Sequence, residues 1–136
     1  MHTTNYYNVF IEIADDCKTD KGEMPPIKGE KKTVANLQFD MLYENPYKYT
    51  SDEVLFSVFA IRNEVDKSEM TEQREHYFSK GQPCFRASPL TKSYGWGIHS
   101  NEEGKIAMYG VETEDYKKFL SDDSIKKVKA MNSKRK

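Results

Sequence analysis

The stretch QPCFRASPLTKSYGWGIHSNEEGKIAMYG, residues 82–110, decides the fold of this chain. It contains a polar turn, Ser100–Glu103, which Gly104 closes, and an apolar or aromatic segment on each side of it, Tyr94–His99 and Lys105–Tyr109. Two such segments, joined by a loop with glycine at a position of positive φ, are typical of a β-hairpin. We therefore expect two antiparallel strands here.

The first of these strands is expected to have one bulky face and one bare face, because side chains alternate along a strand. The bulky face would carry Tyr94, Trp96 and Ile98, and the bare face Gly95, Gly97 and His99. Glycines at alternate positions leave a groove that another chain segment can approach closely. The groove can be filled by a helix or aromatic side chain of the same domain, or it can serve as a ligand cleft.

Outside the hairpin, the apolar pattern predicts one more strand and several helices. Tyr6–Ala14 alternates like a strand. Thr33 is the expected N-cap of a helix that stops at Asn45-Pro46, and Thr50 opens a capping box before the apolar run Leu55–Ile61. A strand is the competing interpretation of that run, and the capping box favours the helix, which we expect in the centre of the core.

Weaker signals predict the remaining elements. A third, half-exposed helix is expected from Asp66 to about Gly81, and a fourth after Thr113, with Tyr116, Phe119 and Leu120 facing the core. Cys84–Ala87 reads as a short extended segment. Ile125, Val128 and Met131 at spacing three indicate a further turn or two of helix. These elements predict an α+β fold, in which a small antiparallel sheet, made of the N-terminal strand and the hairpin, is covered on one face by about four helices.

The length of 136 residues suits a single domain, residues 1–136. A charged loop is expected at about residues 18–32, where it can be a plain excursion or a lid or binding loop. A flexible basic tail is expected at about residues 132–136. The run 126–136 holds six Lys or Arg and no acid, and it reads either as a frayed, solvated end or as a charged docking segment.

Composition excludes several classes of protein. The 21 basic and 22 acidic residues give a net charge of -1, which argues against a nucleic-acid partner. No segment is long and apolar enough for a membrane span, and nothing resembles a secretory signal. Cys17 and Cys84 form no metal or disulfide framework, so a cytoplasmic location with reduced thiols is expected.

Candidate site residues gather around the hairpin. Arg86, Ser88, Lys92 and His99 offer donors suited to a carboxylate or phosphate, with Trp96 as a neighbouring wall, and together they predict an anion-binding cleft. The alternative is that Arg86 stacks on Trp96 or pairs with an acidic side chain.

Cys84 and His99 are the candidate catalytic pair, because a thiol needs a nearby base to become a nucleophile at neutral pH. A small, unreactive Cys84 is the alternative. The histidines have no metal-ligand spacing, and no nucleotide-binding or HExxH motif occurs. We therefore expect no metal and no cofactor.

Three strings, NYYNVFIEIADDC (5–17), KKTVANLQFDMLYENPYKYTSDEVLF (31–56) and SKGQPCFRASPLTKSYGWGIHSNEEGKIAMYG (79–110), carry a resemblance to a known family. They resemble a family of small bacterial proteins grouped only as a domain of unknown function. FRASPLTKSYGWGIHS is the most distinctive part, and the likeness covers essentially the whole chain. The resemblance implies a bacterial, cytosolic, single-domain protein, and it brings no catalytic residues with it.

Taken together, these observations predict a non-catalytic binding or interaction module that holds a small anionic ligand or a protein partner at the hairpin. The alternative is a small enzyme that uses Cys84, Arg86 and His99. Because Tyr and Trp are enriched at interfaces, the aromatic hairpin can also serve in a homodimer.

Overall fold

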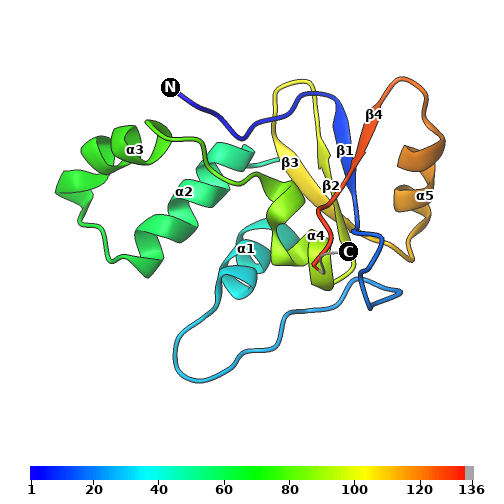
Figure 1. The fold of residues 1–136 in the computed structure, drawn as a ribbon, viewed down its shortest axis with the longest axis horizontal. Helices are drawn as coiled ribbons and strands as arrows, with labels where there is room; N and C mark the ends of the chain where they lie inside the picture. The colour runs from blue at the N-terminus through cyan, green and yellow to red at the C-terminus, as the bar shows by residue number, and fades with distance from the viewer. Residues whose placement is uncertain (134–136) are drawn as a thin grey trace.

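A computed structural model describes residues 1–133 and shows an α+β fold, as the sequence predicts (Figure 1). In chain order the elements are β1 (Val9–Glu12), α1 (Val34–Tyr43), α2 (Ser51–Arg62), the 3-10 helix η1 (Lys67–Glu69), α3 (Met70–Phe78), the 3-10 helix η2 (Phe85–Ala87), α4 (Pro89–Ser93), β2 (Trp96–Ser100), β3 (Ile106–Gly110), α5 (Glu114–Ser121) and β4 (Lys126–Lys129). The last three positions of the predicted tail lie outside the described residues. Within the described part of the chain, no helix combines the length and apolar content that crossing a bilayer would take.

The sheet has the strand order β3-β2-β1-β4. β2 and β3 form the predicted hairpin, with Gly104 at φ +81°, and β1 pairs antiparallel with β2 in the register Phe10 to His99 and Ile11 to Ile98. Tyr94 and Gly95 precede β2, so the predicted alternation applies only from Trp96 onward. The predicted strand and hairpin are therefore confirmed and lie side by side.

The chain end corrects one prediction. Residues 126–129 are neither helical nor frayed but form β4, which runs parallel to β1. The Lys126 N–H donates to the Asn8 carbonyl, and the Ala130 N–H donates to the Glu12 carbonyl at 2.9 Å. β4 has four residues, and its one apolar residue is the half-buried Val128. One apolar residue among lysines sets no hydrophobic period, so the sequence does not distinguish this strand from a helix.

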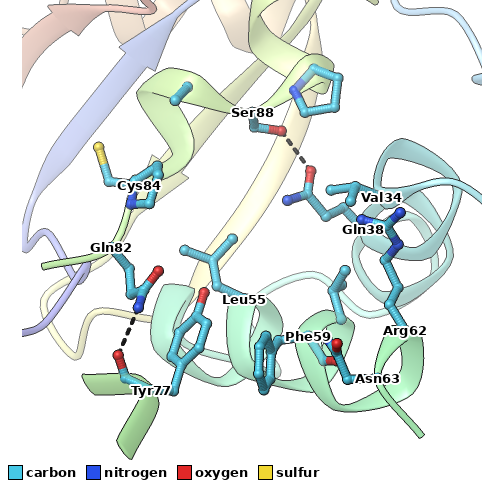
Figure 2. Close-up of a pocket in the computed structure, with 14 residues that line it drawn as sticks. Val34, Gln38, Leu55, Phe59, Arg62, Asn63, Tyr77, Gln82, Cys84 and Ser88 are labelled. Carbon is cyan, nitrogen blue, oxygen red and sulfur yellow. Dashed lines mark hydrogen bonds between the residues drawn. The ribbon is translucent and has the colours of Figure 1, made fainter. Parts of the chain in front are cut away.

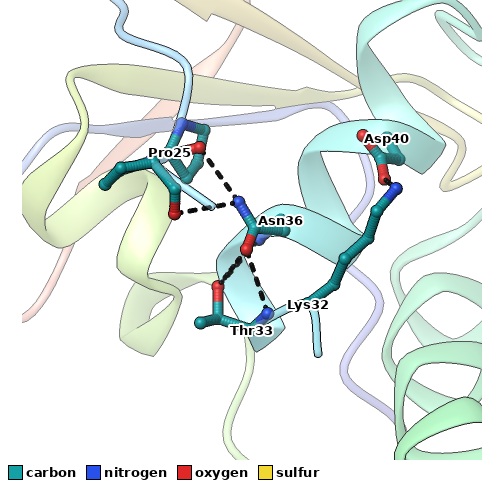
Figure 3. A network of polar contacts seen from close by, with 6 residues as sticks. Pro25, Lys32, Thr33, Asn36 and Asp40 are labelled. Atoms are coloured by element: carbon teal, nitrogen blue, oxygen red, sulfur yellow. Dashed lines mark hydrogen bonds and ion pairs between the residues drawn. The ribbon is translucent and has the colours of Figure 1, made fainter. Parts of the chain in front are cut away.

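Side-chain caps start α1 and α2 where the sequence places them. Thr33 and Thr50 each accept the backbone N–H of the residue three positions later, and that residue's side chain binds back to the cap. In α1 the residue is Asn36, whose amide nitrogen also donates to the carbonyl of Pro25 at 2.9 Å (Figure 3). This bond fixes the middle of the 18–32 loop to the first turn of α1.

The segment before the hairpin differs from its prediction. Cys84–Ala87 is not extended, because Phe85–Ala87 form η2 and α4 follows at once. Ser88 caps α4 by accepting the Leu90 N–H, and Pro89 occupies the first turn, where its missing N–H costs nothing. The end of the third helix also differs: α3 ends at Phe78 with Ser79 as its C-cap, so Gly81 lies beyond it.

Two apolar clusters lie on either side of α2. The main core joins one face of the sheet to α1, α2 and α4, and its fully buried members include Ile11, Leu42, Val54, Leu90 and Ile98. A smaller cluster of Phe56, Ala60 and Phe78 holds α3 against α2. Helix α2 is therefore central, as expected, although Ile61 is exposed.

Helix α5 covers the opposite face of the sheet, so helices flank both faces rather than the one expected (Figure 1). Its Tyr116 ring meets Phe10 edge to face at 4.9 Å, and its hydroxyl accepts the Ile13 N–H at 2.9 Å. Leu120, predicted to face the core, is 41% exposed. The groove at Gly97 is thus filled by aromatic side chains of the same domain, which is one of the two alternatives that the sequence leaves open.

We predict that Gly97→Ala destabilises the fold by about 1–3 kcal/mol, the usual cost of overpacking. A Cβ at this position would lie 2.6 Å from both Phe10 Cζ and Tyr116 Cε2, and both rings are held by neighbours. Urea denaturation measures the loss. Gly81→Ala is the control, because its Cβ would meet nothing closer than 3.8 Å; equal stability of the two variants would contradict the packing argument.

Candidate functional site

Arg86 and Ser88 take structural contacts in the η2–α4 segment. The Arg86 Nε donates to the Lys129 carbonyl at 2.6 Å, and the Arg86 carbonyl accepts the Met131 N–H at 2.8 Å, so this residue ties η2 to the end of β4. Neither alternative for Arg86, stacking on Trp96 or an acidic partner, is what the structure shows. Ser88 is buried and donates to Gln38 Oε1 at 2.6 Å.

Lys92 and Trp96 lie apart from these contacts. Lys92 lines a small hollow of about 240 Å³ together with Asp16, Lys18 and Ser133. Trp96 is half-buried: its indole N–H donates to the Glu23 carbonyl at 2.8 Å, and its ring packs against α1. The hydrogen bond from Trp96 to Glu23 ties the 18–32 loop to the first residue of β2.

His99 faces α5, where it stacks on Phe119 with 4.3 Å between ring centroids. Its Nδ1 is 2.8 Å from the Tyr47 hydroxyl, which is 2.7 Å from the Tyr109 hydroxyl. Burial lowers the pKa of His99 below its ordinary value of 6.5, and the charge of Asp122 opposes that shift. Burial and the bond to Tyr109 raise the pKa of Tyr47. This chain of hydrogen bonds clamps the 45–50 turn to the hairpin.

The structure therefore does not bring the predicted anion-binding residues together. Arg86 and Ser88 belong to the η2–α4 segment, which packs on the α1 face of the sheet, whereas His99 projects toward α5. The sheet also separates His99 from Cys84, whose Sγ instead lies 3.3 Å from the Tyr6 hydroxyl. Among residues 1–133, no three His, Cys, Asp or Glu side chains gather as a metal site would require.

A cleft that the sequence does not reveal lies between α1, α2 and the 82–89 segment (Figure 2). It has a volume of about 310 Å³, within the lower range of ligand pockets. Apolar side chains form most of its wall, among them Val34, Leu55, Val58 and Phe59. Of the predicted site residues, Cys84 and Ser88 line this cleft.

Gln38 gives the cleft a polar anchor. The residue is only 2% exposed, and its Oε1 accepts the Ser88 hydroxyl. The Ser88 oxygen already accepts the Leu90 N–H, so its proton is directed at Gln38 and fixes the amide oxygen on that side. Within the described residues, the Gln38 Nε2 makes no hydrogen bond to the protein, and this nitrogen is not fully buried. Figure 2 shows this nitrogen turned toward the cleft.

The charge in the lining of the cleft is positive. Arg62, in the last turn of α2, is the one charged residue among those that line it, and Asn63, Gln82 and the Tyr77 ring complete its polar rim. The Gln82 amide is itself held, because it donates to the Tyr77 carbonyl at 2.7 Å. An apolar wall with one buried donor and one cation suits a largely apolar molecule that carries an acceptor group.

The sequence offers only a faint signal for Gln38 and Arg62. Gln38 follows Val34 by four residues and so shares its helical face, which makes it a polar residue at an apolar position. Arg62 reads as an ordinary cation at the end of a helix. Nothing in the local pattern connects either residue with Ser88, which follows Gln38 by fifty positions.

Fold and cleft define a small α+β domain with an apolar pocket between its helices and its pre-hairpin segment. The chain belongs to a family of unknown function, DUF6157, whose family model matches residues 1–136. Neither the curated proteins nor the solved structures include a match to it.

We predict that His99 makes the fold less stable in mild acid. Because its pKa is lowered on folding, the unfolded chain binds more protons, and the free energy of unfolding falls as the pH drops from about 6.5 through the folded-state pKa. In His99→Phe, which keeps an aromatic ring beside Phe119, this fall should be smaller. Urea titrations between pH 7.5 and pH 5, run as a pH series, measure it.

The matched control for this experiment is His76→Phe, since His76 is exposed on α3. It should keep the full pH dependence of the wild-type protein. If His99→Phe and His76→Phe have the same slope of stability against pH, His99 is not the group that titrates with folding.

Proposed function

We propose that this protein is a non-catalytic binding domain that holds one small, largely apolar molecule in the cleft between α1, α2 and residues 82–89. The observation that carries the proposal is the Gln38 amide, which is buried, oriented by Ser88 and directed with its unused N–H donors into an apolar space. Because this nitrogen opens into the cleft, a ligand acceptor there would replace water as its hydrogen-bond partner without any rearrangement of the protein.

The walls of the cleft are rigid, which favours binding without large rearrangement. Val58 is buried in the main core, and Phe59 packs with Tyr77 in the smaller cluster at 4.9 Å between ring centroids. Ser88 is fixed both as the cap of α4 and as the partner of Gln38. A site held by packed elements loses little conformational entropy when a ligand enters.

A small enzyme is the second candidate, because Cys84 is among the residues that line the same cleft, with its sulfur turned toward the edge (Figure 2). Its partner there is the Tyr6 hydroxyl, and burial, together with the bond to Cys84, raises the pKa of Tyr6 to about 12. At neutral pH Tyr6 therefore stays protonated and cannot take the thiol proton. Because a thiolate is the nucleophile in cysteine chemistry, this surrounding favours binding over catalysis.

The location in the cytoplasm and the homodimer stay predictions. Both cysteines are free thiols, as a reducing compartment allows. Tyr43 and Ile61 are exposed apolar side chains on the helical side of the molecule, where a second copy or a protein partner could pack.

We predict that Ala87→Phe weakens binding of the neutral probe N-phenyl-1-naphthylamine, whose fluorescence rises in apolar surroundings, by roughly 50–100-fold. Ala87 lines the cleft, and a phenyl ring placed there displaces the probe from roughly 100 Å² of apolar contact, which contributes about 2.5 kcal/mol. Fluorescence titration measures the affinity, and thermal melting checks the fold.

Ser121→Phe adds the same ring on α5, on the other face of the sheet, and should bind the probe like the wild-type protein. Absence of probe binding to the wild type, or equal binding by Ala87→Phe, would overturn the proposal. In a Cys17→Ser background, Cys84 is the one thiol left to alkylate. A rate of alkylation at pH 7 well above that of free cysteine would favour the enzyme instead.

A further inference from the structure

Arg62 belongs to two adjoining hollows. Besides the cleft, it lines a second hollow of about 420 Å³ with Lys31, Lys32, Leu37, Ile61 and Glu64, called here the basic hollow. The cleft and the basic hollow both lie between α1 and α2, and Arg62 stands where they meet. A ligand that passes Arg62 therefore leaves an apolar space and enters a charged one.

The charges of the basic hollow favour an anion. Three cations face one acid, Glu64, and one of the cations is already occupied, since Lys32 Nζ pairs with Asp40 at 2.5 Å (Figure 3). Within the described residues, neither Arg62 nor Lys31 has an ion-pair partner. Their two charges outweigh that of Glu64. An arginine that is not already paired can bind a phosphate or carboxylate through two parallel hydrogen bonds.

We propose that the ligand is a free single-chain amphiphile with an anionic head, an inference that rests on the proposed function of the cleft. Its hydrocarbon chain lies in the cleft against Leu55 and Phe59, and its head group lies at Arg62 and Lys31 in the basic hollow. The Gln38 amide then donates to the oxygen at the junction of chain and head group. Lys31 gives the 18–32 loop a part in binding, one of the two roles that its length allows.

The test compares octyl phosphate with octanol, which has the same chain without the charge, each below its aggregation limit. Both should displace N-phenyl-1-naphthylamine from the wild-type protein, octyl phosphate about tenfold more tightly, because a charge-assisted hydrogen bond contributes at least that much. Arg62→Gln should remove most of this preference, measured as the ratio of the two affinities. Lys31→Gln should reduce the preference less, because lysine offers no paired donors.

Lys118→Gln on α5 is the charge-matched control, since Lys118 is exposed on the other face of the sheet. If it weakens octyl phosphate as much as Arg62→Gln does, the preference reflects net charge and the head-group proposal fails. If octanol and octyl phosphate bind equally to the wild type, the head-group proposal fails and the cleft stands. If neither displaces the probe, both proposals fail. Pelleting of the wild type with phosphatidic acid vesicles, without displacement by octyl phosphate, would overturn the free amphiphile in favour of a membrane lipid.

Discussion

The pairing of β1 with two partners, one on each of its edges, is the constraint on which the rest of the structure depends. β1 lies between β2 and β4, so its backbone groups are bonded on both sides by segments about 90 and 117 residues away in sequence. Its side chains point both ways: Val9 and Ile11 enter the main core with the helices, and Phe10 meets Tyr116 and Phe119 of α5. Both helical layers are thereby attached to a single strand.

The cleft follows from the position of α2. One side of this helix belongs to the main core through Val54 and Val58, and another belongs to the smaller cluster through Phe56. Leu55, Phe59 and Arg62 lie on the side left between these clusters, where α1 and the 82–89 segment close over them without filling the space. The bond between Ser88 and Gln38 joins those two covering segments. The binding site thus depends on the same contacts that hold the helical layer together.

On the other face of the sheet, the polar chain through His99 has a structural role. Tyr47 has a φ angle of +59°, which a bulky residue rarely adopts, and its N–H donates to the Ile106 carbonyl at 2.9 Å. Its hydroxyl joins His99 to Tyr109. The strain of the backbone is offset by hydrogen bonds from the N–H and from the hydroxyl of Tyr47, so the geometry of the turn needs no ligand to explain it.

The sequence by itself determined the α+β class, β1, the hairpin and the starts of α1, α2 and α5, because each of these depends on local chemistry: alternation, a glycine at positive φ, or a threonine cap. Its candidate site residues included Cys84 and Ser88, which line the cleft, although it grouped them with His99 at the hairpin. Only the tertiary structure decided that β4 is a strand, that Gly97 is covered by Tyr116, and that Gln38 and Arg62 line the cleft. These outcomes depend on contacts between residues far apart in the chain. Burial of a residue by a distant segment does not show in the spacing of the apolar residues around it. The physical reason is that a cleft is defined by the space which packed elements fail to fill, and this space exists only once all of them are in place.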